Sequence, residues 1–273
     1  MPDQDLALRP PRWPFSFEKW YIDTLMPGGA VLLVYLARLH LLGTSMSRVT
    51  ADLFLPGGQH RHGHAIARKA FGSGDQLRFG STAIDGERLS FSTSGLSGEL
   101  SFVARQAPAP LGVPFIEEED GRRLDWVVEV PDAEVRGEVR WPGCRMPVRG
   151  RGYRDRVWLD LLPWRFPITE LRWGRAAAGC HAATWVRAAT KQSVVERCWV
   201  DGQVVDGAER PAELSESRVL LDTAIYDLRG LRLGLLRPIL RRCYGDPEQT
   251  KWAAMAAVAE ERGVAIHEVV RWH

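Results

Sequence analysis

The chain has 273 residues, of which 45% are hydrophobic and 26% charged, and this composition is typical of a globular protein without low-complexity segments. The length suits two modest domains, since domains typically run to about 100–150 residues. Basic residues number 36 and acidic residues 34, and the resulting net charge of +2 provides no whole-molecule attraction for nucleic acid.

The cysteines and the N-terminal segment argue against a metal framework and against secretion. Cys144, Cys180, Cys198 and Cys243 are scattered without zinc-ligand spacing, so we expect neither a metal site nor disulfides. The first residues lack the basic and apolar regions of a secretion signal. We therefore expect a cytoplasmic protein with reduced cysteines.

Short β-strands dominate the first half of the sequence. The apolar run 28–43 contains Arg38 and His40 and is shorter than the roughly 20 residues that span a bilayer, so it indicates a buried strand. The pair Asp85-Gly86 is typical of a tight hairpin turn. The strand candidates of this half are 30–36, 77–79, 89–92, 100–104 and 126–130.

Three alternating histidines, His60, His62 and His64, interrupt this pattern. If they lay on a strand, their rings would share one face and could bind a metal. The Pro-Gly-Gly segment 56–58 precedes them, and no neighbouring carboxylate or cysteine in the sequence completes a ligand set. We therefore expect an exposed loop here and no metal.

The second half continues with short strands and closes with two predicted helices. The segment 227–244 has leucines at helical spacing with arginines opposite, and it fits either a helix packed on a barrel or an interfacial helix that touches a membrane. The segment 246–262 begins with Asp-Pro-Glu and ends before a glycine, which predicts a capped helix. The strand candidates are 158–162, 171–177, 183–188, 194–200, 217–226 and 264–272.

Many short strands with turns at near-regular intervals predict a β-barrel or sandwich in each half. We place the boundary near the Trp-Pro-Gly segment 141–143. The expected domains are an N-terminal barrel over 1–145 and a C-terminal barrel over 146–273, the latter with helices at about 228–262.

Several blocks of sequence resemble a known superfamily. Residues 17–23, FEKWYID, followed by a Gly-Gly pair, resemble its opening E-W-W-Y-F-D … G pattern. Residues 151–158, RGYRDRVW, and 171–175, LRWGR, are similar to its G-x-G-Y-x-D-x-N-W-G … W-x-W-G-R signature, and 265–272 resembles a closing barrel strand. The chain thus resembles the lipocalin-like superfamily of carotenoid 1,2-hydratases, tocopherol cyclases and Diels–Alderases.

The resemblance implies two lipocalin-like barrels packed together, a cavity for an apolar ligand near their junction, and chemistry without a bound organic cofactor. It also implies that Asp155 matches the proton donor proposed for the hydratase branch. Arg154 and Arg156 flank this residue, and an adjacent guanidinium favours an ionised carboxylate. Asp155 is therefore either an acid or orienting residue, or one partner of a structural ion pair with these arginines.

The activity expected from this resemblance is hydration, cyclisation or isomerisation of a polyene, terpenoid or polyketide-like substrate. Protonation of an alkene requires a carboxylic acid and aromatic faces that stabilise a cation. The alternative is a carrier that only binds an apolar ligand, with its acids in turns and its tryptophans in the cores. The candidate catalytic residues are Asp155, Tyr153 and Asp23, and the candidate substrate-binding residues are Trp20, Tyr21, Trp158, Trp164 and Trp173.

Overall fold

The computed structural model describes residues 6–205, 211–224 and 246–272, and the chain forms two compact units. The first unit consists of Met1–Ala109 and Trp126–Asp160, and the second of Pro110–Asp125 and Leu161–His273. Almost all regular structure is β. The described helical segments are two short 3-10 turns, η1 at Pro56–Gly58 and η2 at Pro163–Arg165.

Most strands of the first half of the chain are joined by tight turns, as the sequence pattern predicts. The hairpin between β7 and β8 turns at Asp85-Gly86, where Gly86 has a φ of 57° that favours glycine. The strands are β1 (Phe15–Leu25), β2 (Val31–Leu41), β3 (Thr44–Phe54), β4 (His60–Ala67), β5 (Ala70–Ser73), β6 (Gln76–Phe79), β7 (Thr82–Asp85), β8 (Arg88–Ser92), β9 (Ser97–Ala104), β10 (Ala109–Glu117), β11 (Arg123–Trp141) and β12 (Cys144–Leu159).

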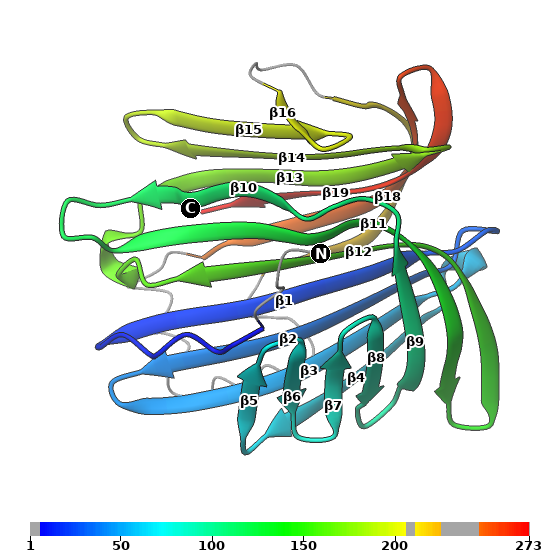
Figure 1. Ribbon diagram of the computed structural model, residues 1–273, viewed down its shortest axis with the longest axis horizontal. Helices are drawn as coiled ribbons and strands as arrows, with labels where there is room; N and C mark the ends of the chain where they lie inside the picture. Colours follow the sequence, from blue (N-terminus) through cyan, green and yellow to red (C-terminus); the bar gives the residue numbers. More distant parts are fainter. Residues whose placement is uncertain (1–5, 206–210, 225–245, 273) are drawn as a thin grey trace. The chain divides into compact units, whose positions relative to one another are not determined.

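The first unit is a nearly closed barrel with the strand order β4-β3-β2-β1-β12-β11-β9-β8-β7-β6-β5. Figure 1 shows its short strands β5 to β8 crosswise to the long strands β1 to β4. Side chains of alternate residues fill the interior, as the period of two in a β-strand requires. Its core includes Trp20, Leu32, Leu36, Leu53, Phe79, Phe91, Phe102 and Val135.

The second unit contains a sheet of seven strands in the order β16-β15-β14-β13-β19-β18-β17. Its core is rich in alanine, with Ala176, Ala183 and Ala254 packed beside Trp185. The strands are β13 (Ile168–Ala178), β14 (His181–Thr190), β15 (Val194–Val200), β16 (Gln203–Val205), β17 (Glu213–Ala224), β18 (Glu248–Val258) and β19 (Glu261–Arg271).

The helix predicted over 246–262 is wrong, because most of this segment is β18 and the start of β19. The Asp-Pro-Glu start and the alanines favour a helix locally, but eleven consecutive pairs join β18 to β19. Ala259 and Glu260 take positive φ values of 48° and 70° in the tight turn between them. Sheet pairing and burial therefore override helix propensity here. The helix predicted over 227–244 lies outside the described residues.

The exposed loop predicted for the histidine string is also wrong. His60, His62 and His64 lie on β4, which pairs with β3 throughout its length. The Pro-Gly-Gly segment forms only η1, a compact turn that reverses the chain into this hairpin.

The expected domain boundary at residues 145–146 falls inside β12, whose residues belong to the first unit. Within the described ranges, no helix is long and apolar enough to span a membrane.

Candidate functional site: the polar face of the first unit

Strand alternation gives β1 two chemically different faces. Trp20 and Ile22 point into the barrel core, so Tyr21 and Asp23 lie on the opposite face. Residues paired directly across antiparallel strands share a face, and the register extends this second face from β1 across four further strands, β12, β2, β3 and β4. We call it the polar face; its residues are Tyr153 and Asp155 of β12, Tyr21 and Asp23 of β1, Tyr35 of β2, Asp52 of β3, and His60 and His62 of β4.

Asp155 is the centre of one part of this face and is 1% exposed. Its Oδ2 accepts a hydrogen bond of 3.1 Å from the indole Nε1 of Trp126 and one of 3.0 Å from the hydroxyl of Tyr153. Tyr21 pairs directly with Asp155 across β1 and β12. Two neutral donors thus fix the orientation of a buried carboxyl group.

Aromatic rings surround this carboxyl group. The ring centroid of Tyr21 lies 6.1 Å from that of Tyr153 and 5.2 Å from that of Tyr35. The ammonium of Lys19 lies 5.9 Å from the Tyr35 ring centroid, within the range of a cation–π contact. The same aromatic faces are suited to stabilising positive charge that develops on a bound molecule.

The arginines that flank Asp155 form ion pairs on the other face of β12. Nε of Arg154 lies 2.7 Å from Oε2 of Glu129, and Nε of Arg156 donates a hydrogen bond of 3.0 Å to Glu18. Burial raises the pKa of Glu18, and Arg156 offsets this only in part. Neighbours in the sequence of a strand point in opposite directions, so these two ion pairs do not involve Asp155.

Four of the predicted site residues therefore share one face: Asp155, Tyr153, Tyr21 and Asp23, of which Asp23 is 1% exposed and pairs directly with Tyr153.

The predicted tryptophans lie elsewhere. Trp20 packs edge-on against Phe79 in the barrel core, and its Nε1 donates a hydrogen bond to Glu129. Trp158 shares that side of the sheet, because it pairs directly with Glu18. Trp164 and Trp173 belong to the second unit; Trp164 is exposed in η2, and Trp173 is buried beneath the ammonium of Lys251 at 5.2 Å.

A second part of the polar face is a cluster of two histidines around Asp52. Oδ1 of Asp52 lies 2.8 Å from Nε2 of His60 and 2.8 Å from Nδ1 of His62. The ring of His60 stacks on that of Phe54 with centroids 4.3 Å apart. Burial acts to raise the pKa of Asp52, but the hydrogen bonds and charges of the two histidines outweigh it and lower this pKa.

The two parts of the face are linked by strand register. Asp23 pairs with Leu33, Leu33 with Asp52, and Asp52 with His62. Since neighbouring strands lie about 4.8 Å apart, Asp23 and Asp52 are separated by about 10 Å along this row. Sequence reasoning missed Trp126, Tyr35 and Asp52, because only the register brings them beside the predicted residues.

The fold defined by these elements is lipocalin-like, and solved structures share it over nearly the whole chain. CghA matches with a TM-score of 0.65 at 13% identity, over 100% of this chain and 93% of its own. An AttH candidate from Nitrosomonas europaea matches with a TM-score of 0.62 at 14% identity, over 98% of both chains.

Kievitone hydratase from Nectria haematococca matches with a TM-score of 0.53 at 10% identity, over 96% of this chain and 90% of its own. No protein-family model and no curated protein sequence matches the chain. Likeness at these identities establishes the fold, which confirms the mainly β, lipocalin-like architecture predicted from the sequence.

Proposed function

We propose that the protein is an enzyme of the hydratase or cyclase type that acts on a large apolar substrate at the polar face of the first unit. The polyenes, terpenoids and polyketide-like molecules are the substrate classes that fit, and Asp155 is the acid or orienting group. The observation that carries the proposal is the buried Asp155 carboxyl group, held by Trp126 and Tyr153 among tyrosine rings.

The chemistry of such reactions explains the choice of residues. Hydration of an alkene and many cyclisations pass through cationic character, which a positioned carboxylic acid initiates and aromatic faces stabilise. Preorganised binding of a flexible chain accelerates cyclisation further, because the entropy of folding the substrate is lost on binding. No step in this scheme requires an organic cofactor.

Two structural neighbours support this class of activity. One is named a hydratase, and CghA has also been solved with the molecule Sch210972. The structure of CghA with Sch210972 matches 98% of this chain at a TM-score of 0.62. The proposal for this chain rests on its own residues, and the neighbours supply the type of reaction to test first.

The test compares wild type with Asp155→Asn and Tyr153→Phe. Apolar material that copurifies with the protein is extracted, identified by mass spectrometry, and offered back to each protein. Asparagine keeps the size of the side chain but cannot supply a carboxylic proton, so we expect kcat to fall about 10²- to 10⁴-fold. Tyr153→Phe keeps the ring and removes one donor to Asp155, so a smaller loss is expected.

Asp85→Asn is the matched control, since Asp85 is an exposed residue at the β7 to β8 turn. It should retain wild-type turnover. Equal turnover by Asp155→Asn would remove Asp155 from the mechanism. If wild type retains an apolar ligand tightly but converts neither it nor related polyenes, the protein is a carrier and the proposed activity is wrong.

A further inference from the structure

Asp52, His60 and His62 bring three potential metal ligands together on the polar face. The nitrogen and oxygen atoms that they offer all lie within 4.8 Å of one another. We propose that these residues form a binding site for one divalent transition-metal ion of the zinc class. This proposal does not depend on the activity proposed for Asp155.

The β3 to β4 hairpin holds the ligand set in place. Asp52 of β3 pairs directly with His62 of β4, and Phe54 of β3 pairs directly with His60. His60 lies two residues before His62 on β4. Residues at i and i+2 of a strand share a face, so both imidazoles project beside the same carboxylate. The stacked Phe54 ring further restricts the orientation of His60.

Burial of the cluster favours a preformed site. The side chains of Asp52, His60 and His62 are 10%, 22% and 14% exposed. Gly63, which follows His62, has no side chain, and a Cβ atom there would lie 2.9 Å from the backbone nitrogen of Gly95. The 93–96 turn therefore packs tightly beside β4, which limits the motion of the ligand-bearing segment.

The chemistry of the donors selects the class of metal. Imidazole nitrogens suit Zn²⁺ and its transition-metal neighbours, whereas Mg²⁺ and Ca²⁺ prefer oxygen ligands. Two histidines and one carboxylate leave a fourth tetrahedral position for water or another ligand. Each present contact from His60 Nε2 or His62 Nδ1 to Asp52 is 2.8 Å, so a small expansion would admit an ion bonded at about 2.0–2.2 Å.

The hydrogen-bonding state of His62 is compatible with coordination. Its Nε2 is buried and has no hydrogen-bond partner within the described part of the chain. The proton that a neutral imidazole retains can therefore move to Nε2 when Nδ1 binds a metal. Coordination replaces the Nδ1 contact with Asp52 and releases one proton if the cluster was protonated.

A second group of potential ligands offers a competing metal site, which the experiment must disable. Cys180, His181 and Glu261 also have ligand atoms within 4.8 Å of one another. Cys180 and Glu261 are exposed, and His181 is already paired with Asp201 at 2.6 Å. The test therefore uses full-length protein with Cys180→Ser, which removes the thiolate without touching the first unit.

The experiment measures Zn²⁺ and Co²⁺ binding to this metal-free protein by calorimetry and by the visible spectrum of bound Co²⁺. We expect one equivalent of Zn²⁺ to bind, and Co²⁺ to give the absorption of a four-coordinate site with nitrogen and oxygen ligands. His60→Ala, His62→Ala and Asp52→Asn should each weaken binding by about 10- to 100-fold or more. Circular dichroism establishes that each variant is folded.

His64→Ala is the matched control. Its ring centroid lies 6.0 Å from that of His62 on the same strand, but it is outside the proposed ligand set, so Zn²⁺ affinity should stay unchanged. The proposal is overturned if the Cys180→Ser protein binds no stoichiometric Zn²⁺, a result that does not depend on any cluster variant folding. Equal binding by folded His60→Ala and His62→Ala would overturn it as well.

Discussion

At the scale of single residues, two glycines of the sequence signature have a packing role. A Cβ atom at Gly152 would meet Val135 and would lie 2.7 Å from the Phe102 ring. A Cβ atom at Gly174 would lie 2.5 Å from Cε2 of Trp185. In both units a large ring packs directly on the backbone of a signature glycine, so these glycines are explained without a contact to substrate.

Gly152→Ala should therefore destabilise the first unit. The added methyl group forces Phe102 and Val135 to move in a closely packed core, and such overpacking typically costs about 1–3 kcal/mol. Denaturant unfolding measures the loss. Phe102→Leu in the same chain removes part of the obstructing ring, so the cost of Gly152→Ala should be smaller in that background. Equal costs in both backgrounds would contradict the assigned clash.

His181 gives a pH-dependent contact at the residue scale. The hydrogen bond from its Nδ1 to Asp201 raises the pKa of His181 above the ordinary value of 6.5. Because the pKa of His181 is raised, its contact with Asp201 stabilises the β14 to β15 hairpin fully at pH values below 6.5. The stabilisation is lost as the pH rises through the raised pKa.

NMR titration of the histidine ring signals tests this assignment. The midpoint for His181 should lie above 6.5 in the wild type and return towards about 6.5 in Asp201→Asn, which keeps the side-chain size but removes the charge. An unchanged His181 midpoint in Asp201→Asn would exclude Asp201 as the cause.

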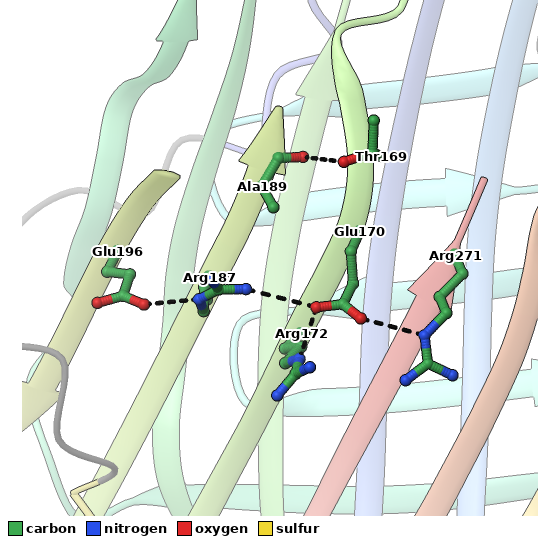
Figure 2. A network of polar contacts seen from close by, with 7 residues as sticks. All are labelled: Thr169, Glu170, Arg172, Arg187, Ala189, Glu196 and Arg271. Carbon is green, nitrogen blue, oxygen red and sulfur yellow. Dashed lines mark hydrogen bonds and ion pairs between the residues drawn. The ribbon is translucent and has the colours of Figure 1, made fainter. Parts of the chain in front are cut away.

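At the scale of elements, one glutamate joins three strands of the second sheet (Figure 2). Glu170 of β13 lies 2.7 Å from Nε of Arg172, 3.4 Å from Arg187 of β14 and 3.1 Å from Nε of Arg271 of β19. Arg187 also pairs with Glu196 of β15 at 2.7 Å. The arginines, with Arg172 foremost, lower the pKa of Glu170.

Glu170→Gln should destabilise the second unit by about 1 kcal/mol at neutral pH. Partly exposed ion pairs contribute little one by one, but this single carboxylate serves three guanidinium groups. A lowered carboxyl pKa contributes stability above the ordinary value of 4.5, which is lost as the pH falls through the folded-state pKa. The difference in melting temperature between Glu170→Gln and wild type should therefore shrink below pH 4.5.

Glu134→Gln is a suitable control for this element-scale prediction, because Glu134 pairs with Arg136 on an exposed surface. Its melting temperature at neutral pH should change much less than that of Glu170→Gln, because an ion pair this exposed contributes little to stability. A Glu170→Gln protein that melts like wild type at neutral pH would show that the network is not a source of stability.

Local signals predicted hairpins better than they predicted the last elements. The Asp-Gly pair at 85–86 does form a turn between paired strands. The capped helix expected over 246–262 failed because its alanines pack in a sheet, and neither capping residues nor composition reports which strand will pair. The exposed loop predicted for the three histidines is wrong for the same reason, since pairing with β3 determines the conformation of this segment.

At the scale of the molecule, the sequence predicted the lipocalin-like fold, and four of the residues it singled out lie on the polar face. Tyr21, Asp23, Tyr153 and Asp155 belong to sequence blocks that resemble a superfamily, and strand alternation alone places each pair on one face. Trp126 and Asp52 have no such signal. They reach Asp155 and the histidines through pairing of β11 with β12 and of β3 with β4, and register over such separations is set by the complete barrel.

The two units differ in the make-up of their cores, and this difference should appear in their stability. Large residues such as Leu32, Leu36 and Phe102 fill the first core, whereas alanines supply most of one core cluster of the second sheet, the cluster around Trp185. Burial of apolar area contributes roughly 25 cal/mol per Å², so this alanine-rich cluster contributes less hydrophobic free energy than the core of the first unit. We therefore expect the second unit to open at lower denaturant than the first.

Hydrogen exchange with mass spectrometry at increasing denaturant measures this order directly. Peptides from β13, β14 and β18 should exchange before peptides from β1, β2 and β3. Leu36→Ala should cost about 2–5 kcal/mol and bring the exchange of the first unit closer to that of the second. Exchange of both sets of peptides at one denaturant concentration in the wild type would instead mean that the two cores unfold as a single cooperative structure despite their different composition.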